Sequence, residues 1–394
     1  FHAAQALHLK GWVIEIADTQ KESFPDRKTR ARVTSYGNLK EDCERRDFTV
    51  NMLYQNVVSD ELLDPSGCGR ADISNKLLRT HPAVDAAKIF SDDPLRMIRM
   101  VRFQTRFSWS VDPGTWEKAV KTRERLEILS AERVRDELIK IMERGTLSAA
   151  LRAFRELGFL EILWPEFLPM IGCEQDKIYH SEGDVWTHTL MVIDEAPKDV
   201  RQQLTALLHD IGKPATQTRV GDRIKFLKHE EVSCELALKF LKKWKFPTEL
   251  GKHVVKLVAL HLRGGDVSLW KTLKPARKLI RDAGTLLEPL LQFIEADSRA
   301  SLGADGKARL DHIPMLREKL SQAEVVPIVT APVLSGHDIM KELGLKPGKS
   351  IKTIQRALEE RSDLLAESGE IFTRERAIEW LRQSFDTSTL SFRK

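Results

Sequence analysis

Helical periodicity is the feature that most constrains the fold of this chain. From Asp85 onward, apolar residues recur at three- and four-residue spacing, as they do on the buried face of an amphipathic helix. The segments that show this spacing are residues 88–107, 131–144, 146–157, 201–210, 230–245 and 250–262. A chain in which this pattern dominates from Asp85 onward is not expected to be built on a large sheet. We therefore predict a mainly α-helical protein.

Sheet is expected only near the start of the chain. Trp12–Ala17 alternates between two faces in the two-residue period of a strand. The pattern predicts a polar loop over residues 21–28. A helix is then predicted to begin near Asp47, which is a good N-cap residue, with Phe48 and Met52 on its buried side.

Composition excludes several classes of protein. The chain has 394 residues, which suggests three or four folding units, and 42% apolar and 31% charged residues, which is typical of an ordered globular protein. Its net charge of +5 permits a nucleic-acid partner without requiring one. The four cysteines form no C-x-x-C pair, so we expect reduced thiols in a cytoplasmic protein. No apolar run is long enough to span a membrane.

Two clusters of arginine suggest a nucleotide site. Arg45–Asn51 places two guanidinium groups, a carboxylate and an amide at a predicted helix start, and triphosphates need such permanently charged donors. A solvated charged cap is the alternative. Asp92–Phe103 then places Arg96, Arg99 and Arg102 at three-residue spacing.

Asp93 and Arg96 lie three residues apart, so one helical face can present an acceptor beside a donor. Cytosine and adenine each offer an amino group beside a ring-nitrogen acceptor, whereas guanine and uracil offer a carbonyl beside a ring N–H. The pair could therefore select C and A without a template. The alternative is an intrahelical ion pair worth roughly 0.2–0.5 kcal/mol.

These segments resemble two signature motifs of class II tRNA nucleotidyltransferases and bacterial poly(A) polymerases. Ser130–Glu137 looks like the next helical motif of that family. The resemblance implies that Asp93 and Arg96 read the incoming base. It implies a nucleotide-binding set of Arg45, Arg46, Asp47, Asn51, Asp93, Arg96, Arg99 and Arg133, in which the first four hold the ribose and triphosphate.

The chain departs from the family pattern in two places. Asp92 stands where the family usually has Glu. The family's Gly-Gly loop and Asp-x-Asp pair, which hold two Mg²⁺ ions for nucleotidyl transfer, do not occur before Trp12. We expect them to be encoded upstream. Glu15 is the candidate for a third catalytic carboxylate, and a solvent-facing strand glutamate is the alternative.

Histidines cluster in the middle of the chain, where six of the eleven lie between His180 and His261. His209 and Asp210 are adjacent at the end of an apolar helix, with Lys213 nearby. Neutral imidazole and carboxylate together suit Mn, Fe, Co, Ni or Zn, and such a metal can activate water against a phosphate ester.

The order of these residues resembles that of the HD phosphohydrolase superfamily. The resemblance implies a transition-metal site formed by His188, His209, Asp210 and Asp297, with His229 and His261 as the extra ligands of binuclear members. We expect His180 and His253 to be surface residues.

Together these features predict a small polymerase β-like α/β head followed by an all-α neck and body, an HD domain and a helical tail. The expected segments are 1–78 for an incomplete head, 79–172 for the neck and body, 173–302 for the HD domain and 303–394 for an RNA-binding tail. The implied activity is addition of C and/or A from CTP and ATP to the 3′ end of tRNA.

Several alternatives remain open on the sequence. A-only addition and poly(A) tailing share the same base-reading pair. The chain could instead be an HD phosphohydrolase with a degenerate head, or an RNA-binding remnant without activity. The sequence leaves the oligomeric state undefined.

Overall fold

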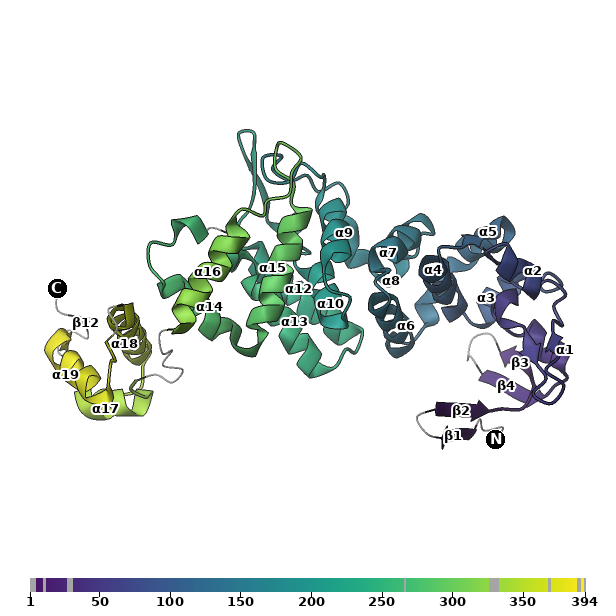
Figure 1. The fold of residues 1–394 in the computed structure, drawn as a ribbon, viewed down its shortest axis with the longest axis horizontal. Helices are drawn as coiled ribbons and strands as arrows, with labels where there is room; N and C mark the ends of the chain where they lie inside the picture. Colours follow the sequence, from purple (N-terminus) through teal and green to yellow (C-terminus); the bar gives the residue numbers. More distant parts are fainter. Residues whose placement is uncertain are drawn as a thin grey trace.

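The fold is elongated and mostly helical, with a small α/β head at one end and a helical tail at the other (Figure 1). It was obtained as a computed structural model. It describes residues 5–9, 12–26, 31–265, 267–325, 333–367, 370–387 and 391–392. No helix among these residues is long and apolar enough to cross a membrane. The prediction of a mainly α-helical chain with a small α/β head is confirmed.

The head begins with two antiparallel hairpins. Strands β1 (Gln5–Leu9) and β2 (Trp12–Ile16) form the first, and β3 (Gln20–Asp26) and β4 (Ala31–Tyr36) form the second. The strand at residues 12–16 is as predicted. The prediction of a polar loop over residues 21–28 is wrong for residues 21–26, which belong to β3, and residues 27–28 lie outside the described residues. β3 pairs only with β4, so it does not need the apolar alternation of a strand buried in a larger sheet.

The prediction that a helix starts near Asp47 is also wrong. Helix α1 (Leu39–Glu44) precedes it, with Asn38 and Glu41 forming a capping box, and Arg45 lies at its C-terminal end. Residues Thr49–Asn51 form a single 3₁₀ turn, η1. The Asp47 carboxylate accepts bonds from side chains across the cavity described below, and it does not cap a helix. Phe48 and Met52 are fully buried, as expected.

Short elements complete the head and join it to the neck. They are β5 (Tyr54–Gln55), β6 (Leu62–Leu63), α2 (Gly69–Ser74), β7 (Leu77–Leu78), α3 (Ala86–Asp92), α4 (Leu95–Phe107) and β8 (Ser110–Val111). The single helix expected over residues 88–107 is divided between α3 and α4. Pro94 disfavours a helical conformation at the preceding residue, and Asp93 is extended with φ −138° and ψ 95°.

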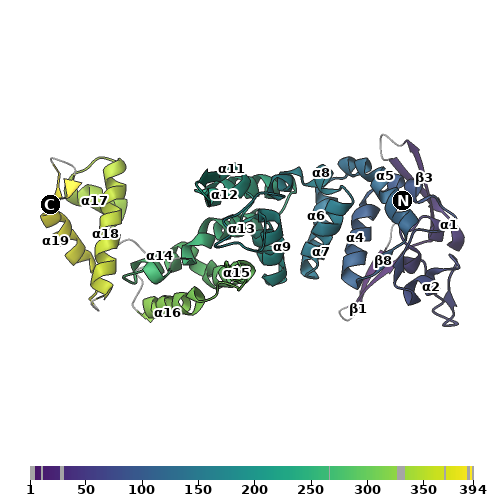
Figure 2. The same cartoon turned by 90° about the horizontal axis from the view of Figure 1, so that it is seen from above.

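Stacked helices form the middle of the molecule (Figure 2). The body contains α5 (Pro113–Thr122), η2 (Arg123–Ile128), α6 (Ala131–Glu143), α7 (Leu147–Glu156), α8 (Leu160–Leu163) and η3 (Pro165–Met170). The following region contains α9 (Val185–Glu195), α10 (Val200–Leu208), α11 (Lys213–Thr216), β9 (Gln217–Val220), β10 (Arg223–Phe226), α12 (His229–Lys243), α13 (Thr248–Leu260), η4 (His261–Gly264), η5 (Val267–Leu269), α14 (Lys274–Ala283), η6 (Gly284–Leu286), α15 (Leu287–Ala300) and α16 (His312–Val325).

The tail contains α17 (Gly336–Leu343), α18 (Lys349–Glu367), α19 (Arg374–Ser384), β11 (Phe385–Asp386) and β12 (Ser391–Phe392). One hydrophobic cluster includes residues from Phe48 in the head to Ala300 at the end of α15, and a second, from Leu257 to Ala323, lies among α13–α16. The tail has its own cluster, from Leu334 to Phe385. The head, body and first helices of the following region therefore share a core, and the tail packs separately.

Candidate nucleotide cavity and candidate metal centre

A cavity of about 550 Å³ lies between the head and the neck. All eight residues of the predicted nucleotide-binding set line it. The complete lining is Glu22, Arg45, Arg46, Asp47, Asn51, Asp93, Leu95, Arg96, Arg99, Phe103 and Arg133. The fold thus brings the two arginine clusters and the Ser130–Glu137 segment to one place.

Asp47 organises one wall of this cavity. Its carboxylate accepts a bond from Arg99 Nε at 2.8 Å and another from Asn51 Nδ2 at 2.9 Å. On the next turn of α4, Arg102 donates to the buried carboxylate of Glu137 at 2.6 Å. The amide and the guanidinium groups are therefore held in fixed positions, as a preorganised anion site requires.

Asp93 and Arg96 face the cavity from different backbone elements. Asp93 lies in the break before α4, and both of its carboxylate oxygens accept bonds from Arg133, at 2.9 and 3.0 Å. The Arg96 guanidinium donates to the carbonyls of Ile89 at 3.0 Å and Arg45 at 2.5 Å. The acceptor and the donor are thus brought to one cavity, but one helical face does not present both, because the helix is interrupted between them.

Glu22 is a carboxylate that the sequence interpretation missed. It lies on β3 with a side chain only 4% exposed, and it accepts a bond from Arg45 at 2.7 Å. Arg96 Nη2 lies 3.9 Å from its other oxygen. The prediction of a loop over residues 21–28 excludes Glu22 from the candidate residues. The potential of this segment to pair with residues 31–36 as a β-hairpin is the signal that could have identified Glu22.

A second carboxylate holds Arg45 from the other side. Asp42 accepts bonds from Arg45, Arg46 and the Tyr54 hydroxyl. Burial alone would raise the pKa of Asp42, but these donors outweigh burial and lower it to about 2. Arg45 and Arg46 are therefore positioned by a carboxylate that stays ionised.

The three carboxylates that line the head cavity are already paired with arginine. Glu22, Asp47 and Asp93 all follow this pattern, and every group of ligand atoms close enough to hold a metal lies outside the head. Glu15 lies on β2, paired with Ala6, and its side chain falls outside the described residues. A transferase metal site therefore does not fit the described head residues.

The six residues predicted to bind metal do come together. They lie on α9, at the C-terminal end of α10, at the start of α12, just after α13 and on α15. They form two adjoining groups, His188, His209 and Asp297 in one, and Asp210, His229 and His261 in the other. Within each group, the ligand atoms lie within 4.8 Å of one another.

The histidine orientations in this cluster are fixed by the backbone. The Nδ1 atoms of His209, His229 and His261 lie 2.9, 2.9 and 2.6 Å from the carbonyl oxygens three residues earlier. Their Nε2 atoms therefore face inward, and those of His229 and His261 are 3.3 Å apart. Burial, together with the neighbouring His209, lowers the pKa of His261 to about 4. A neutral imidazole with an inward-facing Nε2, such as that of His261, is suited to bind a metal.

Unsatisfied atoms support the same interpretation. His209 Nε2 and both carboxylate oxygens of Asp210 are buried and form no well-directed hydrogen bond. Asp210 forms ion pairs at 2.7 Å with Lys213 Nζ and at 3.2 Å with His229 Nε2, and these compensate part of its charge. A divalent cation would engage the remaining lone pairs of the carboxylate and the imidazoles. The residues present thus fit a divalent metal.

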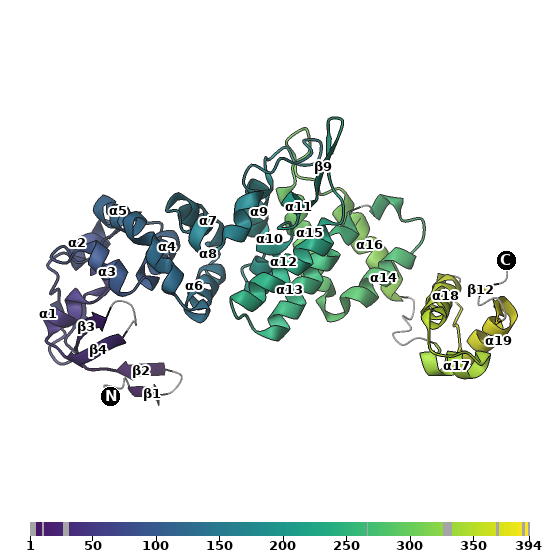
Figure 3. The ribbon, with the colours of Figure 1, turned by 180° about the vertical axis from the view of Figure 1, so that it is seen from behind.

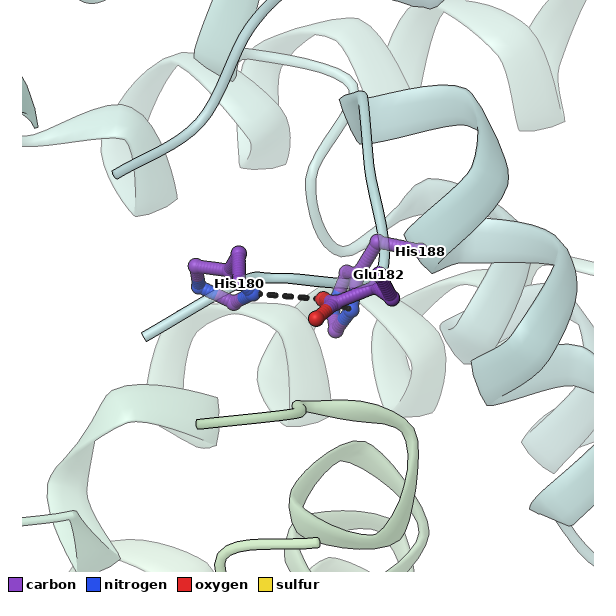
Figure 4. A group of neighbouring side chains, drawn as sticks. All are labelled: His180, Glu182 and His188. Atoms are coloured by element: carbon purple, nitrogen blue, oxygen red, sulfur yellow. Dashed lines mark hydrogen bonds and ion pairs between the residues drawn. The ribbon is translucent and has the colours of Figure 1, made fainter. Parts of the chain in front are cut away.

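Glu182 extends the cluster outward. Its Oε1 atom lies 2.8 Å from Nδ1 of both His180 and His188, so that the carboxylate sits between the two rings (Figure 4). Burial alone would lower the pKa of His188, but Asp297 and Glu182 raise it to about 9. The expectation that His180 is a surface residue is wrong, because the bond to Glu182 draws it into the cavity beside the metal cluster.

Comparison with known proteins places these two sites in a class. A family model described as "Poly A polymerase head domain" matches residues 2–79, and one described as "Probable RNA and SrmB- binding site of polymerase A" matches residues 109–171. A third model, "HD domain", matches residues 184–298. The chain therefore contains, in this order, a head of the poly(A) polymerase type, an RNA-binding segment of that class and an HD domain.

Relatives matched over more than three quarters of their length identify the family. The chain is 31% identical to an A-adding tRNA nucleotidyltransferase of Deinococcus radiodurans, over 86% of this chain and 78% of that protein. It is 30% identical to a multifunctional CCA protein of Burkholderia pseudomallei, over 81% of this chain and 77% of that protein. The chain belongs to the tRNA nucleotidyltransferase family.

Solved structures agree at the level of the fold. A Bacillus stearothermophilus CCA-adding enzyme in complex with CTP aligns with a TM-score of 0.62 at 20% identity, covering 97% of this chain and 81% of that one. A CCA-adding enzyme in apo form II aligns with a TM-score of 0.54 at 19% identity, covering 96% and 79%.

Proposed function

We propose that this chain selects CTP and ATP in the head cavity for addition to the 3′ end of tRNA. The observation that carries the proposal is that all eight predicted nucleotide-binding residues line one cavity. Arg45, Arg46, Asp47 and Asn51 would hold the ribose and triphosphate. Asp93 and Arg96 would read the base, with Arg99 and Arg133 as ion-pair partners of Asp47 and Asp93. Relatives named as A-adding and CCA enzymes support the tRNA end as the acceptor.

Base selection would come from Asp93 and Arg96. The Asp93 carboxylate can accept from the exocyclic amino group of cytosine or adenine, and an Arg96 N–H can donate to the adjacent ring nitrogen. Guanine and uracil present the opposite pattern at these atoms. The backbone carbonyls that hold Arg96, together with the Arg133 ion pair to Asp93, keep the two groups from turning to fit the wrong base.

Equilibrium binding of the four nucleoside triphosphates tests base selection without requiring transfer. ATP and CTP should bind about tenfold or more tightly than GTP and UTP, because the wrong base leaves a charged group unpaired. Equal affinity for all four would overturn the assignment of Asp93 and Arg96.

Transfer is tested with two acceptors, tRNA that ends before CCA and tRNA that ends in CC. The protein is incubated with each acceptor and with CTP alone, ATP alone and both, and product lengths are read on a gel. Growth by three nucleotides with both substrates indicates CCA addition, whereas growth only on tRNA ending in CC indicates A addition. Absence of growth on every acceptor would contradict the proposal.

A second function is favoured by the buried His/Asp cluster. We infer that it binds a divalent transition metal and hydrolyses a phosphate ester, because its donor set is neutral imidazole with carboxylate and three of its atoms lack hydrogen-bond partners. In this reaction the oxygen of water bonds to phosphorus, the ester P–O bond breaks, and the alcohol leaves with a proton. A bound metal would supply the acidity of that water.

A further inference from the structure

A groove of about 670 Å³ lies between helices α12 and α13, outside the two sites described above. Figures 1 and 3 show α13 at the lower edge of the helical middle of the molecule, with α12 beside it. The β9–β10 hairpin, which borders the cavity beside the His/Asp cluster, lies at the upper edge. The groove and that cavity share no lining residue.

The periodicity of the two helices gives the groove an apolar floor. Leu238 and Leu241 lie three residues apart on α12, and Val255 and Ala259 lie four apart on α13, so one face of each helix lines the groove. Phe246, in the loop that joins the helices, extends this floor. The side chain of Leu238 is 58% exposed. An open apolar floor with a polar rim is typical of an interaction surface.

Four exposed lysines rim this floor, two from each helix. They are Lys242, Lys245, Lys252 and Lys256. Lys245 is ion-paired with Glu132, and Lys252 with Glu249. Among the described residues no carboxylate pairs with either of the other two lysines, and no acidic side chain lines the groove. The rim therefore carries positive charge that the chain itself does not compensate, and it attracts a negatively charged partner.

Gly251 on α13 lies on the floor of the groove, where the packing of the chain does not require a glycine. Glycine is less favourable than alanine within a helix. Among the described residues outside the helix backbone, a Cβ atom at this position would meet only Leu241 Cδ1, at 3.8 Å, which is an ordinary van der Waals distance. A position without a Cβ atom lets another molecule approach the helix closely. This glycine therefore favours an occupant that lies against the floor.

We propose that the α12–α13 groove binds an acidic amphipathic helix of a partner protein. An apolar stripe on that helix would cover Leu238, Leu241 and Val255, and carboxylates beside the stripe would pair with Lys242 and Lys256. Laying a helix into a groove between two others buries apolar faces on all three. Single-stranded nucleic acid would also pair with the lysines, but its bases stack on aromatic side chains, and the exposed part of this floor is aliphatic.

Two synthetic peptides test the proposal by fluorescence anisotropy with the full chain. The first has about 14 residues, or four helical turns, with leucines at helical spacing and glutamates on both sides of them. The second has the same composition in scrambled order. The first should bind at least about tenfold more tightly, because only it places its leucines on one face. Equal affinity of the two peptides would overturn the proposal, since charge alone would then explain binding.

Variants of the floor and of the rim show where the peptide binds. Gly251→Leu fills the floor without disfavouring the helix, and it should weaken binding of the amphipathic peptide about tenfold or more. Lys242→Glu combined with Lys256→Glu should weaken it about tenfold. Lys239→Glu combined with Lys225→Glu is the matched control, because both lysines are exposed and lie outside the groove. ATP binding in the head should be the same in all variants, which verifies their folding.

Three results would overturn the proposal. The first is unchanged peptide affinity in both groove variants. The second is a tenfold loss of tRNA affinity in the rim variant while the amphipathic peptide does not bind, because the groove would then be an RNA site. The third is self-association of the chain, measured by sedimentation, that Gly251→Leu abolishes, because a second copy would then occupy the groove.

Discussion

The head cavity and the HD cluster handle their charges in opposite ways. In the head cavity, the carboxylates of Glu22, Asp47 and Asp93 are paired with arginine, and the side chains of Arg46 and Arg133 remain 38% and 48% exposed. In the HD cluster, Asp210 and three inward-facing imidazoles are almost fully buried. The head cavity thus balances its carboxylates with arginines, whereas in the HD cluster Lys213 compensates only part of what is buried, and a bound cation would compensate the rest.

The largest effect should follow loss of a metal ligand. Asp210→Ala is expected to lower both metal content and phosphate release by more than about a hundredfold, because losing a ligand exceeds the 10–100-fold effect of losing a group that only orients one. Binding of ATP in the head should stay within about twofold of the parent protein, since the sites share no residue. Metal analysis and phosphate assays measure this. Asp222→Ala, in the exposed hairpin turn, is the control. Retained metal would contradict the assignment of Asp210.

The second-largest effect is expected on nucleotide binding in the head cavity. Arg96→Ala should weaken ATP and CTP binding about thirtyfold, because a charged donor to the base is lost. Phosphate release by the HD cluster should not change. Arg106→Ala lies on the same helix beyond the cavity and serves as the control. If Arg96→Ala weakens GTP as strongly as ATP, the residue does not read the base.

A smaller effect is expected for the carboxylate behind His188. Glu182→Gln should lower metal affinity about tenfold, because the ring loses a charged partner that orients it. Competition with a chelator gives the affinity, and the matched change is Glu195→Gln at the end of α9, the helix that carries His188. The proton balance should also shift: without Glu182 the raised pKa of His188 falls, so metal binding should extend to lower pH. An unaltered pH profile would argue against this role of Glu182.

Salt gives the smallest effect and tests the comparison as a whole. Raising ionic strength from 0.05 to 0.3 M should weaken ATP binding by about threefold, because exposed charges are screened. Metal retention by the buried cluster should change much less. Equal salt sensitivity at the two sites would mean that burial does not distinguish them.

Sequence patterns predict which residues come together in space better than they predict the local backbone structure. The order His188, His209–Asp210 and Asp297 was sufficient to find the metal cluster, because the helices that carry these residues are strongly periodic. The helix start at Asp47 was mistaken because its carboxylate serves Arg99 and Asn51 across the cavity, contacts that no local pattern encodes. The capping box formed by Asn38 and Glu41 is a local sequence signal that predicts the start of α1.

Long-range pairing explains the remaining errors. Glu22 was overlooked because a strand with a single partner carries little apolar alternation. His180 was assigned to the surface because only the fold brings Glu182 between it and His188. Both residues depend on partners that lie in another element or loop, and periodicity reports on one element at a time.

The core that runs from Phe48 to Ala300 has a consequence for the cooperativity of the chain. Elements that share buried side chains lose them together, so the neck, the body and the first HD helices should unfold in one transition. Cutting the chain between the body and the HD domain would expose that core on both fragments. The tail, which has a cluster of its own, is the part that can melt first without carrying either site with it.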